Sequence, residues 1–249
     1  MNKRTLSILT TISFILMIVV NLISTFGLFG VTPVKEISDE YTNLLVPMGY
    51  TFSVIWTVIY ALLLIYTGKE LVGKEDKYNI NWLFMISNVL NTLWIITFTN
   101  GLYLISCITI AGLFVVLYMI NSRIKDTNLT KVTFSIYTTW ILVASAVNIN
   151  YYLVSLNFAA FDSVLMKIIS VLMIVATTLI VLMNYNNITM KITYIFALTG
   201  IAVNHIVALD FAYIDMMIIV GLVIGYTLFT LLSELITNNR KDYMSHEAI

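Results

Sequence analysis

Charge is scarce in this sequence. Only 10% of its 249 residues are charged, against about 25% in soluble domains, whereas 60% are hydrophobic. Lys and Arg together number 13, the same as Asp and Glu, and no long basic block occurs. A chain without a basic face is not expected to bind nucleic acid. The composition instead predicts a polytopic membrane protein whose main partner is the lipid bilayer.

Cysteine and histidine are also rare, which argues against two kinds of site. Cys107 is the single cysteine, so no intramolecular disulfide can form, and His205 and His246 are far apart in sequence. A Cys/His metal cluster is therefore not expected, nor a resident cofactor. His205 has no evident second ligand, so we interpret it as a satisfied interior residue rather than a haem or metal ligand.

Apolar runs recur from end to end, and each is long enough for the roughly 20 residues that cross a bilayer as a helix. They predict an all-α fold, a polytopic membrane bundle of about eight transmembrane helices. The predicted spans are residues 6–28, 50–72, 80–98, 102–120, 130–153, 163–183, 192–209 and 213–236. The first run is longer than the core of a signal peptide and no Ala-x-Ala site follows it, so we interpret it as a retained span.

Basic and acidic residues alternate between the connections. One set of ends carries Lys3, Arg4, Lys69, Lys74, Lys77, Arg123, Lys125, Lys131, Lys191, Arg240 and Lys241. The other set carries Lys35, Glu36, Asp39, Glu40, Asp162, Asp210 and Asp215. By the positive-inside rule, eight spans then place both termini in the cytoplasm.

Lys167 lies about one turn inside the sixth predicted span. We expect its side chain to snorkel outward or to pair with Asp162. The functional alternative is a partner among Asp210 and Asp215, which would form an ion cluster on the outer side.

Three predicted spans carry aromatic and amide residues at steps of three and four, which fall on one face of a helix. The stripes are Phe52, Trp56, Tyr60 and Leu63; Asn88, Asn91, Trp94 and Phe98; and Tyr137, Trp140, Ala144 and Asn148. In lipid their polar edges should face other helices or an enclosed pocket. If the stripes converge, they form an aromatic box suited to a flat, largely apolar ligand.

The same stripes have a structural interpretation. Aromatic residues at helical spacing are usually packing, and Asn88, Asn91, Asn148 and Asn204 could serve only to join helices, each contributing about 0.6–2 kcal/mol. Gly221 and Gly225 in the last span indicate close packing inside the bundle in preference to a homodimer contact, which is the alternative.

Three motifs together resemble the signatures of the TspO/MBR family, the tryptophan-rich sensory proteins related to the mitochondrial translocator protein. The motifs are Trp56-Thr57-x-x-Tyr60, Leu90-Asn91-x-x-Trp94-x-x-x-Phe98 and Tyr137-x-x-Trp140-x-x-x-Ala144-x-x-x-Asn148. They lie on the second, third and fifth spans, in the family's order. The resemblance covers about residues 6–153 and implies a five-helix core, residues 1–156. Three additional transmembrane helices and a cytoplasmic tail follow in residues 157–249.

The resemblance implies a ligand-binding or sensory protein of the bacterial plasma membrane. In the family, the five helices enclose a pocket for tetrapyrroles such as porphyrin or haem, for sterols and for synthetic aromatic ligands, with the loop after the first helix as lid. The pocket positions carried over by motif are Trp56, Tyr60, Asn91, Trp94, Tyr137, Trp140, Ala144 and Asn148.

Two departures from the family narrow this expectation. Only Pro47 remains of the proline-rich start of the second helix, and no basic residue follows Tyr151 and Tyr152 until Lys167, so cholesterol is not an expected ligand. No catalytic residues are expected. Some bacterial relatives are reported to degrade porphyrins in light with a pocket tryptophan, for which Trp94 or Trp140 would be the counterpart.

A transporter of a small hydrophobic or amphipathic molecule is the alternative function. Transporters usually mark their path with carboxylates inside the membrane or with helices broken by Gly and Pro. No Asp or Glu lies in the middle of a predicted span and no span contains Pro, so coupled transport is disfavoured. A hydrolase would need a nucleophile with a base or a metal, and the sequence contains no such constellation.

Overall fold

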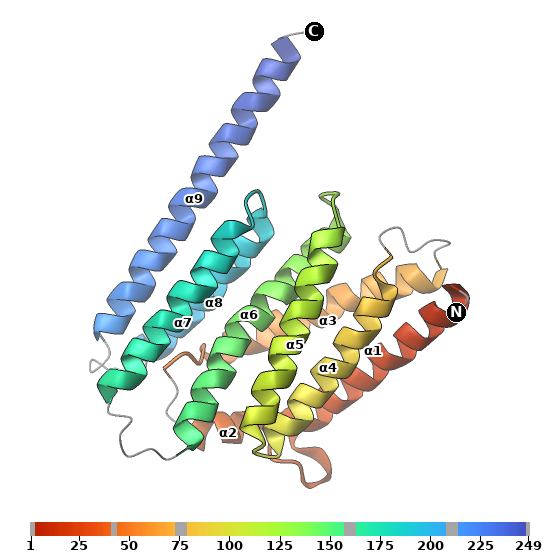
Figure 1. The fold of residues 1–249 in the computed structure, drawn as a ribbon, viewed down its shortest axis with the longest axis vertical. Coiled ribbons are helices and arrows are strands. Elements are labelled where there is room, and N and C mark those ends of the chain that lie inside the picture. The colour runs from red at the N-terminus through yellow and green to blue at the C-terminus, as the bar shows by residue number, and fades with distance from the viewer. Residues whose placement is uncertain (1–2, 41–43, 73–78, 157–162, 208–213, 248–249) are drawn as a thin grey trace.

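The computed structural model describes residues 3–40, 44–72, 79–156, 163–207 and 214–247 (Figure 1). Within these ranges the chain is helical, and eight helices are long and apolar enough to span a membrane. They are α1 (Lys3–Phe26), α3 (Gly49–Val72), α4 (Asn81–Thr99), α5 (Tyr103–Arg123), α6 (Leu129–Ser155), α7 (Ser163–Met183), α8 (Ile188–Val207) and α9 (Ile214–Glu247). The predicted all-α bundle of eight spans is therefore confirmed.

The first five spanning helices form a closed ring. In this ring α1 packs on α4, α4 on α5, α5 on α6, α6 on α3, and α3 on α1. The connection between α4 and α5 is tight because Gly101 takes a left-handed conformation, with a φ of 71°. Such a short connection makes the two helices antiparallel neighbours. We call α1 and α3–α6 the five-helix ring.

The last three spanning helices form a second group beside α6. Both α7 and α8 pack on α6, α8 also reaches α3, and α9 packs on α7 and α8. Figure 1 shows α9 at the edge of the bundle, with its C-terminal part extending past the other helices. In the spanning part of α9 only 22% of the residues are buried. In α6, the helix of the ring that borders the second group, 61% are buried.

The second group also approaches the ring closely where α8 meets the start of α3. A Cβ atom on Gly200 would lie 2.6 Å from Cγ2 of Thr51, so only glycine allows this approach. The backbone N–H of Met48, just before α3, donates a hydrogen bond to the carbonyl oxygen of Gly200 at 3.0 Å. The second group therefore helps to position the first turn of α3.

The connection from α1 to α3 was expected to be a loop, but it contains a short helix. After the 3-10 turn η1 (Leu28–Gly30), α2 runs over Val34–Glu40. Its Ile37 is buried against Phe98, Tyr103 and Tyr151. Helix α2 thereby covers the end of the ring formed by α4, α5 and α6.

The seventh span begins at Ile188, four residues before the predicted start, so Lys191 lies in the first turn of α8 and is fully buried. One expectation about the second group is wrong. Gly221 and Gly225 do not pack inside the bundle: both are exposed, and a Cβ atom on either would meet nothing within 4 Å. A Gly-x-x-x-Gly pattern permits close approach of helices but does not supply a partner.

Candidate functional site

Trp56 lies at the centre of a group of aromatic rings from α3, α4 and α6. Its ring stacks on Tyr60, with centroids 5.2 Å apart and an interplanar angle of 28°, and on Trp94, at 6.1 Å and 19°. Tyr137 and Trp140 meet it edge-on, with centroids at 6.3 Å and 6.5 Å. The three stripes thus converge. We call Trp56, Tyr60, Trp94, Tyr137 and Trp140 the aromatic cluster.

Asn91 lies beside this cluster and joins three helices. Its Nδ2 donates to the Tyr137 hydroxyl on α6 at 2.9 Å, and its Oδ1 accepts from Nδ2 of Asn21 on α1 at 2.7 Å. Asn91 and Tyr137 are completely buried. The amide is therefore engaged on both sides by protein, as the structural interpretation of this residue requires.

Asn148 is engaged in the same way at the other end of the cluster. Its Oδ1 accepts from Nε1 of Trp94 at 3.0 Å and from Oγ of Ser106 at 2.9 Å. Its Nδ2 contacts Sγ of Cys107 at 3.1 Å. These bonds tie α6 to α4 and α5. Since both amides already have protein partners, their first role is to hold the rings in place.

The other two indoles of the cluster differ from Trp94. The Nε1 atoms of Trp56 and Trp140 are buried and have no hydrogen-bond partner among the described residues. A buried unsatisfied donor costs about 1–3 kcal/mol. The cluster therefore has two indole N–H groups that are available to donate hydrogen bonds to an acceptor.

The rings fill most of the space between them. Among the eight predicted pocket positions only Tyr60 and Ala144 are partly exposed, and the other six are buried. A small cavity of about 10 Å³ lies on the other side of α6, between α6, α7 and α8, and a groove of about 360 Å³ faces outward between α1 and α4. None of the eight positions lines either space. A ligand would therefore have to separate the rings in order to bind.

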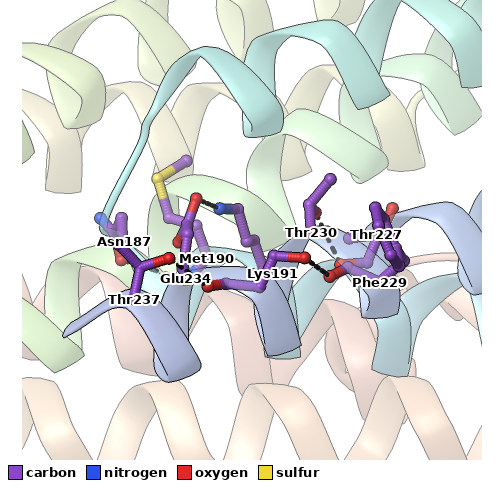
Figure 2. Close-up of polar contacts among 9 residues, drawn as sticks. Asn187, Met190, Lys191, Thr227, Phe229, Thr230, Glu234 and Thr237 are labelled. Atoms are coloured by element: carbon purple, nitrogen blue, oxygen red, sulfur yellow. Dashed lines mark hydrogen bonds and ion pairs between the residues drawn. The ribbon is translucent and has the colours of Figure 1, made fainter. Parts of the chain in front are cut away.

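A buried ion pair between α8 and α9 was missed from the sequence. Nζ of Lys191 contacts Oε1 of Glu234, and the two side chains are only 1% and 4% exposed (Figure 2). Glu234 lies inside the last predicted span, but near its end. Only a carboxylate in the middle of a span was expected to mark a functional site. The pair could not be found from spacing, because the partners are 43 residues apart.

Other predicted positions can be placed as well. Lys167 pairs with Asp215 at 3.2 Å, whereas Asp162 and Asp210 lie outside the described residues. His205 is buried, with Nε2 2.9 Å from the carbonyl oxygen of Leu44, which confirms its interpretation as a satisfied interior residue. In the described part of the chain no three His, Cys, Asp or Glu side chains come together as a metal site.

Eight apolar helices, five of which form a ring with a buried tryptophan and asparagine network, define a polytopic membrane protein. The chain belongs to the family of TSPO-like proteins, since the model of that family matches residues 7–232. This confirms the resemblance, and the match extends it over the last three spanning helices. Neither a curated protein nor a solved structure matches the chain significantly. The division of the chain into a five-helix core, residues 1–156, and an additional part, residues 157–249, stays a prediction.

Proposed function

We propose that this membrane protein binds a flat, largely apolar ligand, such as a tetrapyrrole, in the aromatic cluster. The observation that carries the proposal is the pair of buried indole N–H groups of Trp56 and Trp140 that lack an acceptor. A porphyrin offers both a large face for stacking and carboxylate oxygens that accept hydrogen bonds. Family membership supports this class of ligand, and a sensory or carrier role would follow from such binding.

Binding requires the cluster to open. Trp56 and Trp94 are nearly parallel, with centroids 6.1 Å apart. A flat molecule inserted between two rings needs about 7 Å, twice the usual carbon–carbon contact distance. The rings must therefore move apart by roughly 1 Å. We place ligand access at Tyr60 and Ala144, because these are the predicted positions that are partly exposed.

Five of the eight positions then divide into two further roles. Trp56, Trp94 and Trp140 would contact the ligand, and the first and last would also donate hydrogen bonds. Asn91 and Asn148 act as positioning residues, because their amides are engaged with Tyr137, Trp94 and residues of α1 and α5. In this assignment Asn148 makes no direct hydrogen bond to the ligand.

The test is titration of the full-length protein in lipid nanodiscs with protoporphyrin and haem, followed by tryptophan quenching and by porphyrin absorbance. Trp140→Phe keeps an aromatic ring but removes the N–H group, so Kd should rise about three- to tenfold if a hydrogen bond of about 0.6–1.4 kcal/mol is lost. Trp82→Phe is the matched control, because Trp82 is 37% exposed at the start of α4, with Arg123 5.5 Å above its ring. Absence of saturable quenching would contradict the proposal.

Transport of a small hydrophobic or amphipathic molecule is the second candidate. One observation favours it: the buried pair Lys191–Glu234, because charges inside a membrane bundle often mark a transport path. Uptake of the bound porphyrin by proteoliposomes, compared with protein-free liposomes, distinguishes transport from binding alone.

A further inference from the structure

Helix α9 is fastened to its neighbours by an ion pair near each end of its spanning part. At the beginning, Asp215 pairs with Lys167 of α7 at 3.2 Å, and these side chains are 61% and 22% exposed. Nineteen residues later, Glu234 pairs with Lys191 of α8, and that pair is buried. Between the two pairs, α9 contributes buried residues that are mostly apolar: Met216, Val220, Thr227 and Leu231.

The buried pair is expected to dominate this attachment. Apolar contacts hold helices together only weakly in a bilayer, because lipid tails offer the same kind of surface. Exposed ion pairs such as Lys167–Asp215 contribute little, since water screens them. Breaking a buried pair, in contrast, leaves a charge without a partner in a medium that cannot solvate it. The packing of α9 therefore depends chiefly on the charge state of Lys191 and Glu234.

Glu234 has an oxygen atom that is free to take up a proton. Its Oε1 faces Lys191, whereas Oε2 is buried without a hydrogen-bond partner among the described residues. The nearby hydroxyls of Thr230 and Thr237 donate instead to the carbonyl oxygens of Thr227 and Ser233 on the same helix (Figure 2). A proton can thus add to Oε2 while Oε1 keeps its contact with Lys191.

Lys191 has a second place for its ammonium group. Nζ lies 5.6 Å from the ring centroid of Tyr185, whose side chain is 63% exposed in the connection between α7 and α8. Lys191 is only three residues from the start of α8 at Ile188. A lysine in this position can snorkel toward the aqueous edge and remain charged over an aromatic face.

We propose that Glu234 is a proton-binding site that controls the packing of α9 on α8. A proton from the aqueous phase adds to Oε2, the carboxylate becomes a neutral acid, and Lys191 keeps its own proton and its position over the Tyr185 ring, 5.6 Å from the ring centroid. With the attraction lost, α9 loosens at this end, where the buried pair contributed most to its packing on α8. This proton-binding site is separate from the aromatic cluster, and the proposal does not rest on ligand binding there.

Few other titratable groups of the described chain face this site. On α8, Tyr194 is the next such residue after Lys191, and its hydroxyl is bonded to Thr177 and Thr178. His205, also on α8, and Lys167 on α7 lie toward the opposite end of their helices. In the described chain, the charged and titratable groups nearest to Glu234 are therefore Lys191 and Tyr185.

Hydrogen–deuterium exchange of the full-length protein in nanodiscs tests the proposal between about pH 8 and about pH 4. The double variant Lys191→Met/Glu234→Met is the reference, because it replaces the pair by apolar side chains. Comparing both proteins at the same pH cancels the pH dependence of chemical exchange. Residues 223–238 should exchange equally in both at high pH, and several-fold faster in the wild type at low pH.

Two further variants sharpen the result. Glu234→Gln, which imitates the protonated acid, should exchange fast in this segment at every pH. Lys167→Gln/Asp215→Asn removes only the outer pair and should keep the pH response of the wild type. If Glu234→Gln does not fold, the comparison of the wild type with the double variant still tests the proposal. A ratio between those two that stays constant with pH would show that the pair is a static structural contact and would overturn the proposal.

Discussion

The five-helix ring and the second group hold their helices together with different chemistry. The ring joins its helices through uncharged amides, such as Asn91 and Asn148, packed among aromatic rings. In the second group α9 is joined to its neighbours through charges, and among the described residues Lys191 and Glu234 are the buried members of the Lys, Arg, Asp and Glu set. An amide network keeps its hydrogen bonds at any moderate pH, whereas an ion pair depends on two protonation states. The ring is therefore suited to a fixed site and the second group to a response.

The largest expected effect is the loss of stability when the buried ion pair of the second group is broken. Lys191→Met leaves Glu234 buried without a counter-ion and should lower the free energy of unfolding by about 3–5 kcal/mol, whereas the double variant Lys191→Met/Glu234→Met should be close to the wild type. Unfolding in mixed micelles with increasing denaturant measures both. Equal stability of the single and the double variant would mean that the pair carries no buried charge.

The contact between the two groups is tested at Gly200. In Gly200→Ala the new Cβ atom would lie 2.6 Å from Cγ2 of Thr51, so α3 and α8 must move apart at a cost of about 1–3 kcal/mol. Gly225→Ala is the matched control, because its Cβ atom meets nothing within 4 Å and alanine favours the helix by up to about 1 kcal/mol. Thermal unfolding of the two variants should therefore shift in opposite directions.

Asn148→Leu tests the amide network of the ring. The substitution leaves Nε1 of Trp94 and Oγ of Ser106 without their acceptor and should cost about 1–3 kcal/mol in stability. Because we assign Asn148 a positioning role, the folded fraction should bind porphyrin with an affinity within about threefold of the wild type, or about 0.6 kcal/mol. A large loss of affinity in a stable Asn148→Leu protein would instead make this amide a direct ligand contact.

The smallest effect concerns the boundary at residue 156. All eight positions of the proposed site lie before it, so a chain that ends there should bind porphyrin within about threefold of the full-length Kd, or about 0.6 kcal/mol, if it folds. Its stability should be lower, because Gly200 no longer bonds Met48 and His205 no longer bonds Leu44. Lost binding in a folded truncation would show that the second group helps to form the site.

The sequence predicts the spans and the aromatic cluster because both depend on local sequence pattern. Helical spacing places Trp56, Trp94 and Trp140 on the buried faces of their helices, and bilayer thickness sets the length of apolar run that marks each span. The same periodicity says which face of a helix is polar but not which residue will meet it. Lys191–Glu234 and the exposure of Gly221 depend on how α9 docks, which local spacing does not specify. The cytoplasmic location of both termini rests on the charge pattern and stays a prediction.

The central claim is that the aromatic cluster binds a flat ligand, and Trp140→Ala tests it most directly. The substitution removes a stacking face, a donor and part of the wall, so porphyrin Kd should rise about ten- to hundredfold, which corresponds to about 1.4–2.7 kcal/mol. Trp82→Ala, at the exposed start of α4, should leave Kd unchanged. Equal porphyrin affinity of the wild type and a correctly folded Trp140→Ala protein would show that the cluster is packing alone and would contradict the claim.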